Sequence, residues 1–137
     1  MALGWGIVGT GNHVTNWMAP ALSRAADTKL AAICSRELPR AQAVAERFGF
    51  ARAYDSYEQF LRDETVEVVY ICTPNALHAD QAIRAAKAGK HVLVEKPMAL
   101  TRTEGEAMIE ACEVAGVRLG VGFHLRHHPA QRDAREL

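Results

Sequence analysis

Residues 3–11 read Leu-Gly-Trp-Gly-Ile-Val-Gly-Thr-Gly, and this stretch decides the fold that we expect. An apolar strand over residues 3–8 runs into Gly9-Thr10-Gly11, and an amphipathic helix follows. Glycines in such a strand–helix turn permit a tight bend and let backbone N–H groups and the helix dipole approach a pyrophosphate. The pattern therefore predicts the first unit of a dinucleotide-binding domain, although an ordinary strand–helix turn fits the same short pattern.

The helix after this turn departs from the usual fingerprint in two places. Val14 stands where a third glycine is expected, so the helix and the strand should lie slightly further apart. Pro20 is expected to interrupt the helix and to kink it. The helix assignment rests on the apolar residues Val14, Trp17, Met18, Ala21, Leu22 and Ala25.

Strands and helices alternate along the rest of the chain. We expect further strands over residues 30–35, 51–54, 66–72, 91–94 and 117–123, and helices over residues 38–48, 56–63, 77–88 and 101–115. Capping pairs, Ser56 with Gln59 and Thr101 with Glu104, mark the starts of two helices. Parallel strands require helical crossovers, so the sequence predicts an α/β fold: a doubly wound, Rossmann-type parallel sheet of about six strands with helices on both faces.

Composition excludes several classes of protein. The chain has 137 residues, enough for one domain with a real core. Its 16 Lys and Arg balance 16 Asp and Glu, so no net field attracts nucleic acid or an anionic membrane. The longest apolar runs have strand length, and Met1 lies too close to the first strand for a signal peptide. Three isolated cysteines read as buried thiols of a cytoplasmic protein rather than as disulfides or metal ligands: Cys34, Cys72 and Cys112.

The end of the second strand decides which cofactor we expect. An Asp or Glu there would bind the ribose 2′-hydroxyl of NAD, but this strand ends in Ser35 and Arg36. Ser35 can donate to a 2′-phosphate, and Arg36 can pair with it or lie over the adenine. A plain solvated arginine remains the alternative for Arg36, and Glu37 reads as a carboxylate favoured near a helix start. The sequence therefore favours NADP, with NAD as second choice.

Polar residues also follow the fourth strand, at the edge where open α/β sheets bind ligands. Pro74 ends that strand, while Thr73 and Asn75 can contact the ribose and nicotinamide side of a cofactor. A proline-bearing turn before a capped helix explains the same residues without a ligand. His78 lies in the first turn of the next helix, where we expect an exposed ring on local grounds.

Glu95-Lys96-Pro97 follows the buried strand over residues 91–94, and Lys96 is the candidate catalytic residue. A lysine at the end of a buried strand needs a carboxylate or a ligand as partner, and Glu95 is the expected carboxylate. Pro97 fixes the backbone, and a cis bond is one way it would do so. Near a nicotinamide, the ammonium would donate to a substrate oxygen and stabilise an alkoxide. The alternative is a salt-bridged surface pair in a loop.

The segment after the sixth strand reads His124-Leu-Arg-His-His-Pro129. Its histidines lack the spacing of a metal site, so we expect no metal. Arg126 is better placed to pair with a phosphate or a carboxylate. Residues 129–137 read as the first turns of a helix without a cap or a closing apolar face, so the chain looks cut.

These motifs resemble the Gfo/Idh/MocA family, which includes glucose–fructose oxidoreductase and inositol dehydrogenase. The resemblance covers essentially the whole chain and rests on Gly-Ile-Val-Gly-Thr-Gly, Cys-Ser-Arg, Cys-Thr-Pro-Asn, Val-Glu-Lys-Pro and Gly-Phe-His-Leu-Arg-His-His-Pro. Glu-Lys-Pro is its most specific part. The Ser-Arg pair and the His-Leu-Arg tripeptide look closest to members like anhydrofructose reductase or glucose–fructose oxidoreductase.

The resemblance implies an NAD(P)-dependent oxidoreductase that acts on CH–OH groups of a sugar, a polyol or a related hydroxy or keto compound. It implies a pyrophosphate cradle of Gly9, Thr10, Gly11, Asn12 and His13. It places Ser35 and Arg36 at the adenosine. It also implies that the following residues line the rest of the cofactor channel: Thr73, Pro74, Asn75, His78, Glu95, Lys96, Pro97, His124 and Arg126.

Family members are more than twice as long as this chain, and a second α/β domain supplies their catalytic aspartate and histidine. We therefore expect residues 1–123 to form the dinucleotide-binding domain and residues 124–137 to start the connection to an absent substrate and dimerisation domain. The chain should bind cofactor without turnover, and the full-length protein should be a homo-oligomer.

Two rival functions remain open at this point. The first is a non-catalytic nucleotide sensor or regulator with the same fold, against which the intact Lys96 argues. The second is a self-sufficient short reductase, which would need a proton donor among His78, His124, His127 and His128.

Overall fold

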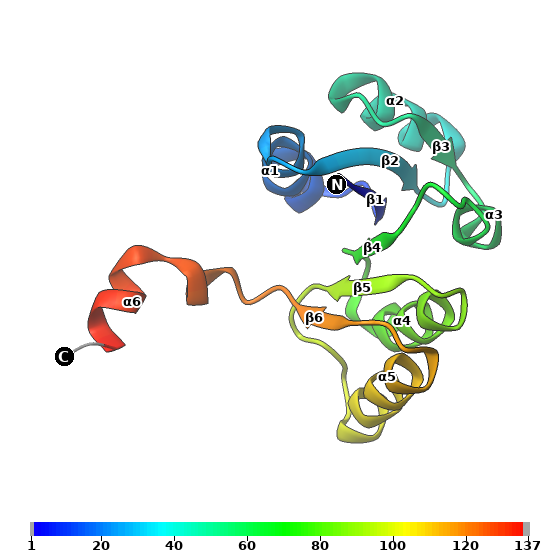
Figure 1. The fold of residues 1–137 in the computed structure, drawn as a ribbon. Coiled ribbons are helices and arrows are strands. Elements are labelled where there is room, and N and C mark those ends of the chain that lie inside the picture. Colours follow the sequence, from blue (N-terminus) through cyan, green and yellow to red (C-terminus); the bar gives the residue numbers. More distant parts are fainter. Residues whose placement is uncertain (1, 136–137) are drawn as a thin grey trace.

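The computed structural model describes residues 2–135, in which six parallel strands form one sheet (Figure 1). The strands are β1 (Leu3–Val8), β2 (Thr28–Cys34), β3 (Arg52–Tyr54), β4 (Val68–Ile71), β5 (His91–Val94) and β6 (Leu119–Val121). Their order across the sheet is β3-β2-β1-β4-β5-β6. The chain thus builds outward from β1 to one edge and then from β4 to the other, which confirms the predicted doubly wound α/β fold.

Helices cover both faces of the sheet. The helices are η1 (Val14–Met18), α1 (Ala19–Arg24), α2 (Leu38–Phe48), α3 (Tyr57–Leu61), η2 (Asn75–Leu77), α4 (His78–Lys87), α5 (Arg102–Ala115), η3 (His124–His127) and α6 (Pro129–Arg135), of which η3 and α6 do not belong to these layers. On one face, α1 and α2 pack around Ile7, Ile33 and Tyr70. On the other face, α3, α4 and α5 pack around Val69 and Ile71. Neighbouring residues of β4 therefore point into opposite cores, as the pleat of a strand requires.

The predicted capping box of Thr101 and Glu104 forms in full, and that of Ser56 and Gln59 forms by one of its two hydrogen bonds. The Glu104 backbone N–H donates to Thr101 Oγ1 at 3.2 Å, and the Thr101 backbone N–H donates to Glu104 Oε2 at 3.0 Å. Ser56 Oγ accepts from the Gln59 backbone N–H at 3.3 Å. Helix α3 and strand β4 are both shorter than predicted. The Val66 N–H donates to the carbonyl of Asp63, so a turn separates these two elements.

The first helix differs from the prediction. The helix changes from η1 to α1 at Ala19, one residue before Pro20, so Pro20 lies in the first turn of α1, where its missing N–H costs no hydrogen bond within α1. The preceding turn has π-helical geometry, and the Ala19 N–H donates to the carbonyl of Val14. Val14 is fully buried between this helix and the sheet, whereas Trp17 is 68% exposed, so only part of the apolar pattern marks the core.

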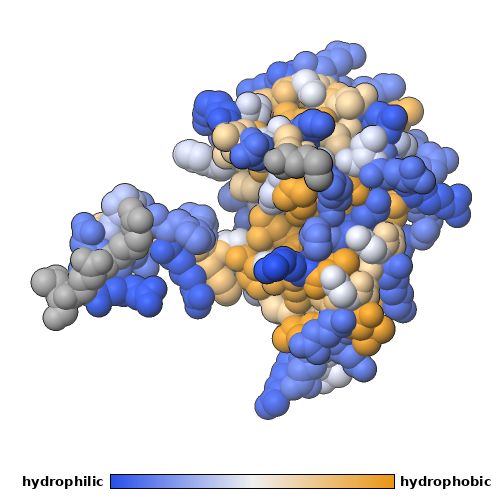
Figure 2. Space-filling view, in the orientation of Figure 1, coloured by the Kyte–Doolittle hydropathy of each residue, from blue (hydrophilic) through white to orange (hydrophobic). Residues whose placement is uncertain are grey.

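The carboxyl-terminal segment lies away from the body of the domain. In Figure 1, η3 and α6 extend from the end of β6 and project from the sheet. Figure 2 shows that α6 is largely hydrophilic, while hydrophobic residues gather across the middle of the face seen there. Phe123, just before η3, and Leu125, within it, are each about half exposed. Between residues 2 and 135, no helix combines the length and the apolar character needed to cross a bilayer.

Candidate functional site

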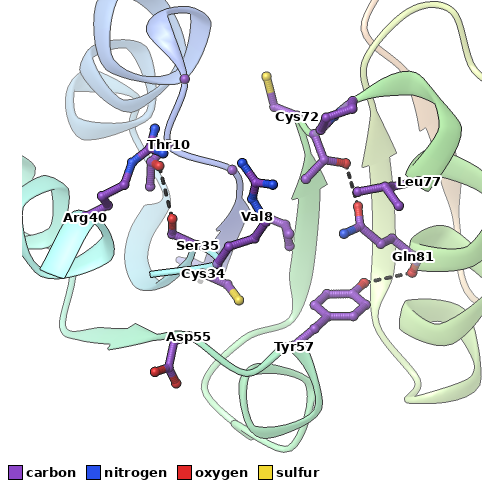
Figure 3. A pocket seen from close by; sticks show the side chains of 15 residues that line it. Val8, Thr10, Cys34, Ser35, Arg40, Asp55, Tyr57, Cys72, Leu77 and Gln81 are labelled. Carbon is purple, nitrogen blue, oxygen red and sulfur yellow. Dashed lines mark hydrogen bonds between the residues drawn. The ribbon is translucent and has the colours of Figure 1, made fainter. Parts of the chain in front are cut away.

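The carboxyl ends of β1, β2 and β4 enclose a cavity of about 330 Å³ (Figure 3). It lies at the point where the strand order reverses, because β1 continues to β2 on one side and pairs with β4 on the other. Open α/β sheets bind their ligands in this crevice. The cavity brings together the predicted residues Gly9, Thr10, Gly11, Ser35, Arg36, Thr73 and Pro74.

The two glycines of the first turn have different reasons to be glycine. Gly9 has φ +113°, and a Cβ there would lie 2.3 Å from the carbonyl oxygen of Cys72. A Cβ on Gly11 would meet no protein atom within 4 Å, and Gly11 borders the cavity. Gly9 therefore allows β1 and the end of β4 to approach closely, whereas Gly11 leaves room for a ligand at the start of the helix.

Hydroxyl and guanidinium groups gather where β2 ends. Thr10 Oγ1 and Ser35 Oγ lie 3.3 Å apart across the neighbouring ends of β1 and β2. Arg36 follows them, and Arg40, in the first turn of α2, lines the same side of the cavity. Glu37 lies outside the cavity lining, and only a 4.0 Å contact between two exposed groups joins it to Arg40. The cavity residues Thr10, Ser35, Arg36 and Arg40 thus offer two hydroxyls and two guanidinium groups. This set of hydrogen-bond donors suits a phosphate group.

The opposite wall of the cavity includes the side-chain amide of Gln81 (Figure 3). The Thr73 hydroxyl donates to Gln81 Oε1 at 2.6 Å, and the Tyr57 hydroxyl donates to the backbone carbonyl of Gln81 at 2.7 Å. The Arg84 guanidinium lies 4.8 Å from the centroid of the Tyr57 ring. The Thr73 bond orients the Gln81 side chain and the Tyr57 bond fixes its backbone, which preorganises this wall for a polar ligand.

The thiol at the cavity floor is not a nucleophile. Cys34 is buried at the end of β2, and burial together with the nearby Asp55 raises its pKa to about 11. Burial likewise raises the pKa of the Cys72 thiol. Both sulfurs therefore stay protonated near neutral pH and serve as packing atoms.

A second polar cluster lies at the end of β5, outside the residues that line the cavity. Tyr70 donates its phenol hydrogen to Glu95 Oε1 at 2.6 Å, and His13 Nε2 lies 3.2 Å from the same oxygen. The Lys96 backbone N–H donates to Glu95 Oε2 at 3.1 Å. The Glu95 side chain is only 13% exposed, whereas that of His13 is 42% exposed. The cluster links the turn after β1 to the end of β5.

The predicted pairing of Glu95 with the Lys96 ammonium is wrong. The Glu95 carboxylate is occupied by Tyr70 and His13, and the Lys96 side chain is exposed with no carboxylate within 4.0 Å among residues 2–135. Tyr70 reaches Glu95 from the neighbouring strand β4, and His13 reaches it from the turn after β1. The bond between Lys96 and Pro97 is cis, as one of the sequence alternatives allowed.

His78 is also placed differently from the sequence expectation. We expected an exposed ring, but its exposure is 0%. Its Nδ1 lies 2.9 Å from the Pro97 carbonyl oxygen, and its Nε2 lies 3.0 Å from the Thr73 carbonyl oxygen. The ring fills the space between the segments that follow β4 and β5, so it holds two strand ends together and does not line the cavity.

The other predicted residues are exposed around the site. Asn12 lies in the turn after β1, and Asn75 begins η2 next to the cavity. His124 and Arg126 belong to η3, and the Arg126 guanidinium lies 5.2 Å from the centroid of the Phe123 ring. None of these four side chains lines the cavity.

Sequence reasoning missed several cavity residues: Arg40, Asp55, Tyr57, Leu77 and Gln81. Asp55 and Tyr57 follow the end of β3, and the same edge rule that selected Ser35 and Thr73 could have found them. Arg40 and Gln81 lie inside helices, where only their nearness to a strand end distinguishes them from solvated residues.

No three His, Cys, Asp or Glu side chains lie together as a metal site would require within the part of the chain that the structure describes.

Residues 3–123 match the model of a family described as "Oxidoreductase family, NAD-binding Rossmann fold". D-Xylose 1-dehydrogenase (NADP(+)) 2 from Haloferax volcanii is 44% identical over 133 residues, which are 97% of this chain and 41% of that protein. 1,5-Anhydro-D-fructose reductase from Ensifer adhaerens is 38% identical, over 95% of this chain and 40% of that protein. The chain thus spans about two fifths of the length of these curated relatives.

Solved structures give the same picture. KijD10, a 3-ketoreductase from Actinomadura kijaniata in complex with NADP, superposes with a TM-score of 0.95 at 33% identity, over 99% of this chain and 43% of that one. GenD2 from gentamicin A biosynthesis, in complex with NAD, superposes with a TM-score of 0.92 at 30% identity, over 98% of this chain and 38% of that one.

Proposed function

The chain belongs to the Gfo/Idh/MocA oxidoreductase family as its NAD-binding Rossmann-fold domain, and we propose that it binds NADP(H) in the cavity between β1, β2 and β4. In the full-length protein, this domain would serve hydride transfer between the cofactor and a CH–OH group of a sugar, a polyol or a related hydroxy or keto compound. The single observation that carries the cofactor choice is the cluster of Thr10, Ser35, Arg36 and Arg40 at the end of β2.

The charge of this cluster supports NADP over NAD. A carboxylate that binds the two ribose hydroxyls would repel a 2′-phosphate, whereas two guanidiniums attract it. Asp55 lines the cavity but follows β3, one strand further out, and Glu37 does not line it. The relatives include an NADP(+)-dependent xylose dehydrogenase and an NADP complex as well as an NAD complex, so the local residues have to decide.

The residues fit a dinucleotide along its whole length. Gly11 and the start of the first helix leave open space with free N–H groups for the pyrophosphate. Thr73 and Gln81 form a polar wall of the cavity, and Glu95 and Lys96 follow the end of β5 as candidate contacts for the nicotinamide half. When bound, NADPH would supply a hydride from C4 of its nicotinamide, and NADP+ would accept one there.

Lys96 is the proposed catalytic residue. Its ammonium is exposed and has no carboxylate partner among residues 2–135, so it can donate to a substrate oxygen. During hydride transfer, that oxygen gains or loses negative charge, and a cation held nearby stabilises the alkoxide form. Lys96 lies two residues beyond the end of β5, at the ligand edge of the sheet.

We also propose that residues 124–135 lead into a second domain that completes the substrate site and mediates oligomer formation. The chain covers about two fifths of the length of its relatives, and we assign the groups that relay the substrate proton to that second domain. The isolated chain would therefore bind NADP(H) without turnover. Its three free cysteines, two of them buried, suit a reducing cytoplasm.

Calorimetric titration of the chain with NADP and then with NAD tests the proposal. We expect tighter NADP binding and, for Arg36→Ala, a loss of at least tenfold in NADP affinity with little change for NAD, because a charged hydrogen bond contributes about 1.5–3 kcal/mol. Arg102→Ala on α5 is the control, since Arg102 is exposed and, among residues 2–135, pairs only with Glu106. Equal loss for both cofactors would discard the phosphate role, and binding of neither would refute the function.

A further inference from the structure

Tyr70 is a buried side chain whose hydroxyl the core does not need. It is the largest of the fully buried residues, and it stands on β4 between Ile7 of β1 and Leu93 of β5. A phenylalanine would fill the same apolar space without a polar group to satisfy. The hydroxyl instead donates to Glu95 Oε1 at 2.6 Å, so its role has to be sought at that carboxylate.

The Glu95 carboxylate is held from several sides. Tyr70 and His13 meet Oε1, and the Lys96 N–H meets Oε2. Gly122 leaves room for it, because a Cβ there would lie 2.8 Å from Oε1. A carboxylate offers about four lone-pair directions, so these three contacts leave one on Oε2. Since the carboxylate only accepts hydrogen bonds, a donor such as a hydroxyl suits this remaining position.

We propose that Tyr70 is a positioning residue that fixes Glu95 as the acceptor for a hydroxyl of the nicotinamide ribose, and that His13 ties this acceptor to the pyrophosphate turn. This inference rests on the proposed function, since it assigns the far half of the same cofactor site. His13 follows the Gly9-Thr10-Gly11 turn by two residues, so its contact with Glu95 links the turn after β1 to the end of β5, past the end of β4 that lies between them. If a dinucleotide places its pyrophosphate at this turn, the nicotinamide ribose is the next sugar along the cofactor and would approach Glu95.

Burial makes Tyr70 a permanent donor. Burial first, and then the bond to Glu95, raises the pKa of the phenol far above its ordinary value. The hydroxyl therefore keeps its hydrogen at any working pH, and the carboxylate stays oriented.

Three variants test this role in the whole chain: Tyr70→Phe, Gly122→Ala and, as a control, Tyr54→Phe. Tyr70→Phe removes the phenol hydrogen bond and keeps the ring. Gly122→Ala displaces the carboxylate from the other side, because the atom that its Cβ would meet is the end of a flexible side chain. The Tyr54 hydroxyl also donates to a carboxylate, that of Asp63 at 3.1 Å, but neither residue lines the cavity.

Each variant is titrated with NADP and with adenosine 2′,5′-bisphosphate, which reaches only the adenosine half of the site. We expect Tyr70→Phe and Gly122→Ala to weaken NADP binding roughly tenfold, which corresponds to about 1.4 kcal/mol, and to leave the bisphosphate within twofold. Tyr54→Phe should change neither.

Every other pattern overturns the inference. Equal loss of both ligands in Tyr70→Phe would assign it a merely structural role, and unchanged NADP binding in a folded variant would remove the role altogether. If Tyr70→Phe fails to fold, Gly122→Ala decides by the same criterion. A parent chain that binds neither ligand refutes the proposed function, whereas a parent that binds both with unaffected variants refutes only this assignment.

Discussion

Replacing each glycine of the first turn by alanine should separate folding from binding. In Gly9→Ala the new side chain would have φ +113°, which costs about 1–3 kcal/mol, and its Cβ would lie 2.3 Å from the Cys72 carbonyl oxygen. Relief of that contact needs a backbone shift of about 1–3 kcal/mol, so the free energy of unfolding should fall by roughly 2–6 kcal/mol. A domain has only about 5–15 kcal/mol in total, so this variant should be barely stable.

Gly11→Ala should do the opposite. Its Cβ meets no protein atom within 4 Å, and fewer unfolded conformations should make the chain about 0.4–1 kcal/mol more stable. The methyl group would instead occupy the side of the cavity where a pyrophosphate approaches, so we expect NADP affinity to fall at least tenfold.

Urea unfolding, followed by circular dichroism, measures the first effect, and calorimetric titration measures the second. A Gly9→Ala variant within about 1 kcal/mol of the parent would show that the contact with the end of β4 does not require glycine. A Gly11→Ala variant that binds NADP as tightly as the parent would show that the pyrophosphate does not lie at this turn.

Three further predictions concern single side chains. Burial alone would raise the pKa of the Asp63 carboxyl, but hydrogen bonds from Thr65 and Arg52 outweigh burial and hold this pKa below its usual range. The ionised carboxylate therefore stabilises the fold above about pH 4, and this stabilisation is lost as the pH falls further. Urea unfolding between pH 6 and pH 2 should show the loss, and Asp63→Asn should abolish the part of the pH dependence that Asp63 causes. Lys96→Ala in the full-length protein should abolish turnover while NADP affinity stays within twofold, and unchanged turnover, or a protein that never had any, would favour the nucleotide sensor. Cys34 should resist iodoacetamide at pH 7.5 until urea unfolds the chain, because its pKa is about 11; modification of the native chain within minutes, seen by peptide mass spectrometry, would contradict its burial.

The helix starts and the sheet edge could be read from the sequence because they depend on near neighbours. The hydrogen bonds between Thr101 and Glu104 join residues three apart, so the pair identifies its helix without knowledge of the rest of the fold. Parallel strands connected by helices all end at the same side of the sheet, so Ser35 and Thr73 were expected at one edge, and both line the cavity there.

The errors concern contacts between residues far apart in the chain. The ring of His78 is enclosed because the segment after β5 folds over it, and Pro97 is 19 residues away in sequence. Glu95 takes Tyr70 of β4 and His13 of the turn after β1 as partners in place of the adjacent Lys96 ammonium, and these partners lie 25 and 82 residues away in sequence. Local sequence carries no record of such a choice.

The sequence by itself determined the parallel α/β sheet, the ligand edge and the family, because alternation, turn chemistry and motif spacing are properties of short segments. Only the tertiary structure decided which side chains share the cavity and which carboxylate is held in place. Arg40 and Gln81 come from helices on opposite faces of the sheet, and they meet at one cavity because β1 and β4, distant in sequence, lie side by side. Distances between such residues depend on the packing of the whole chain, and no local pattern encodes them.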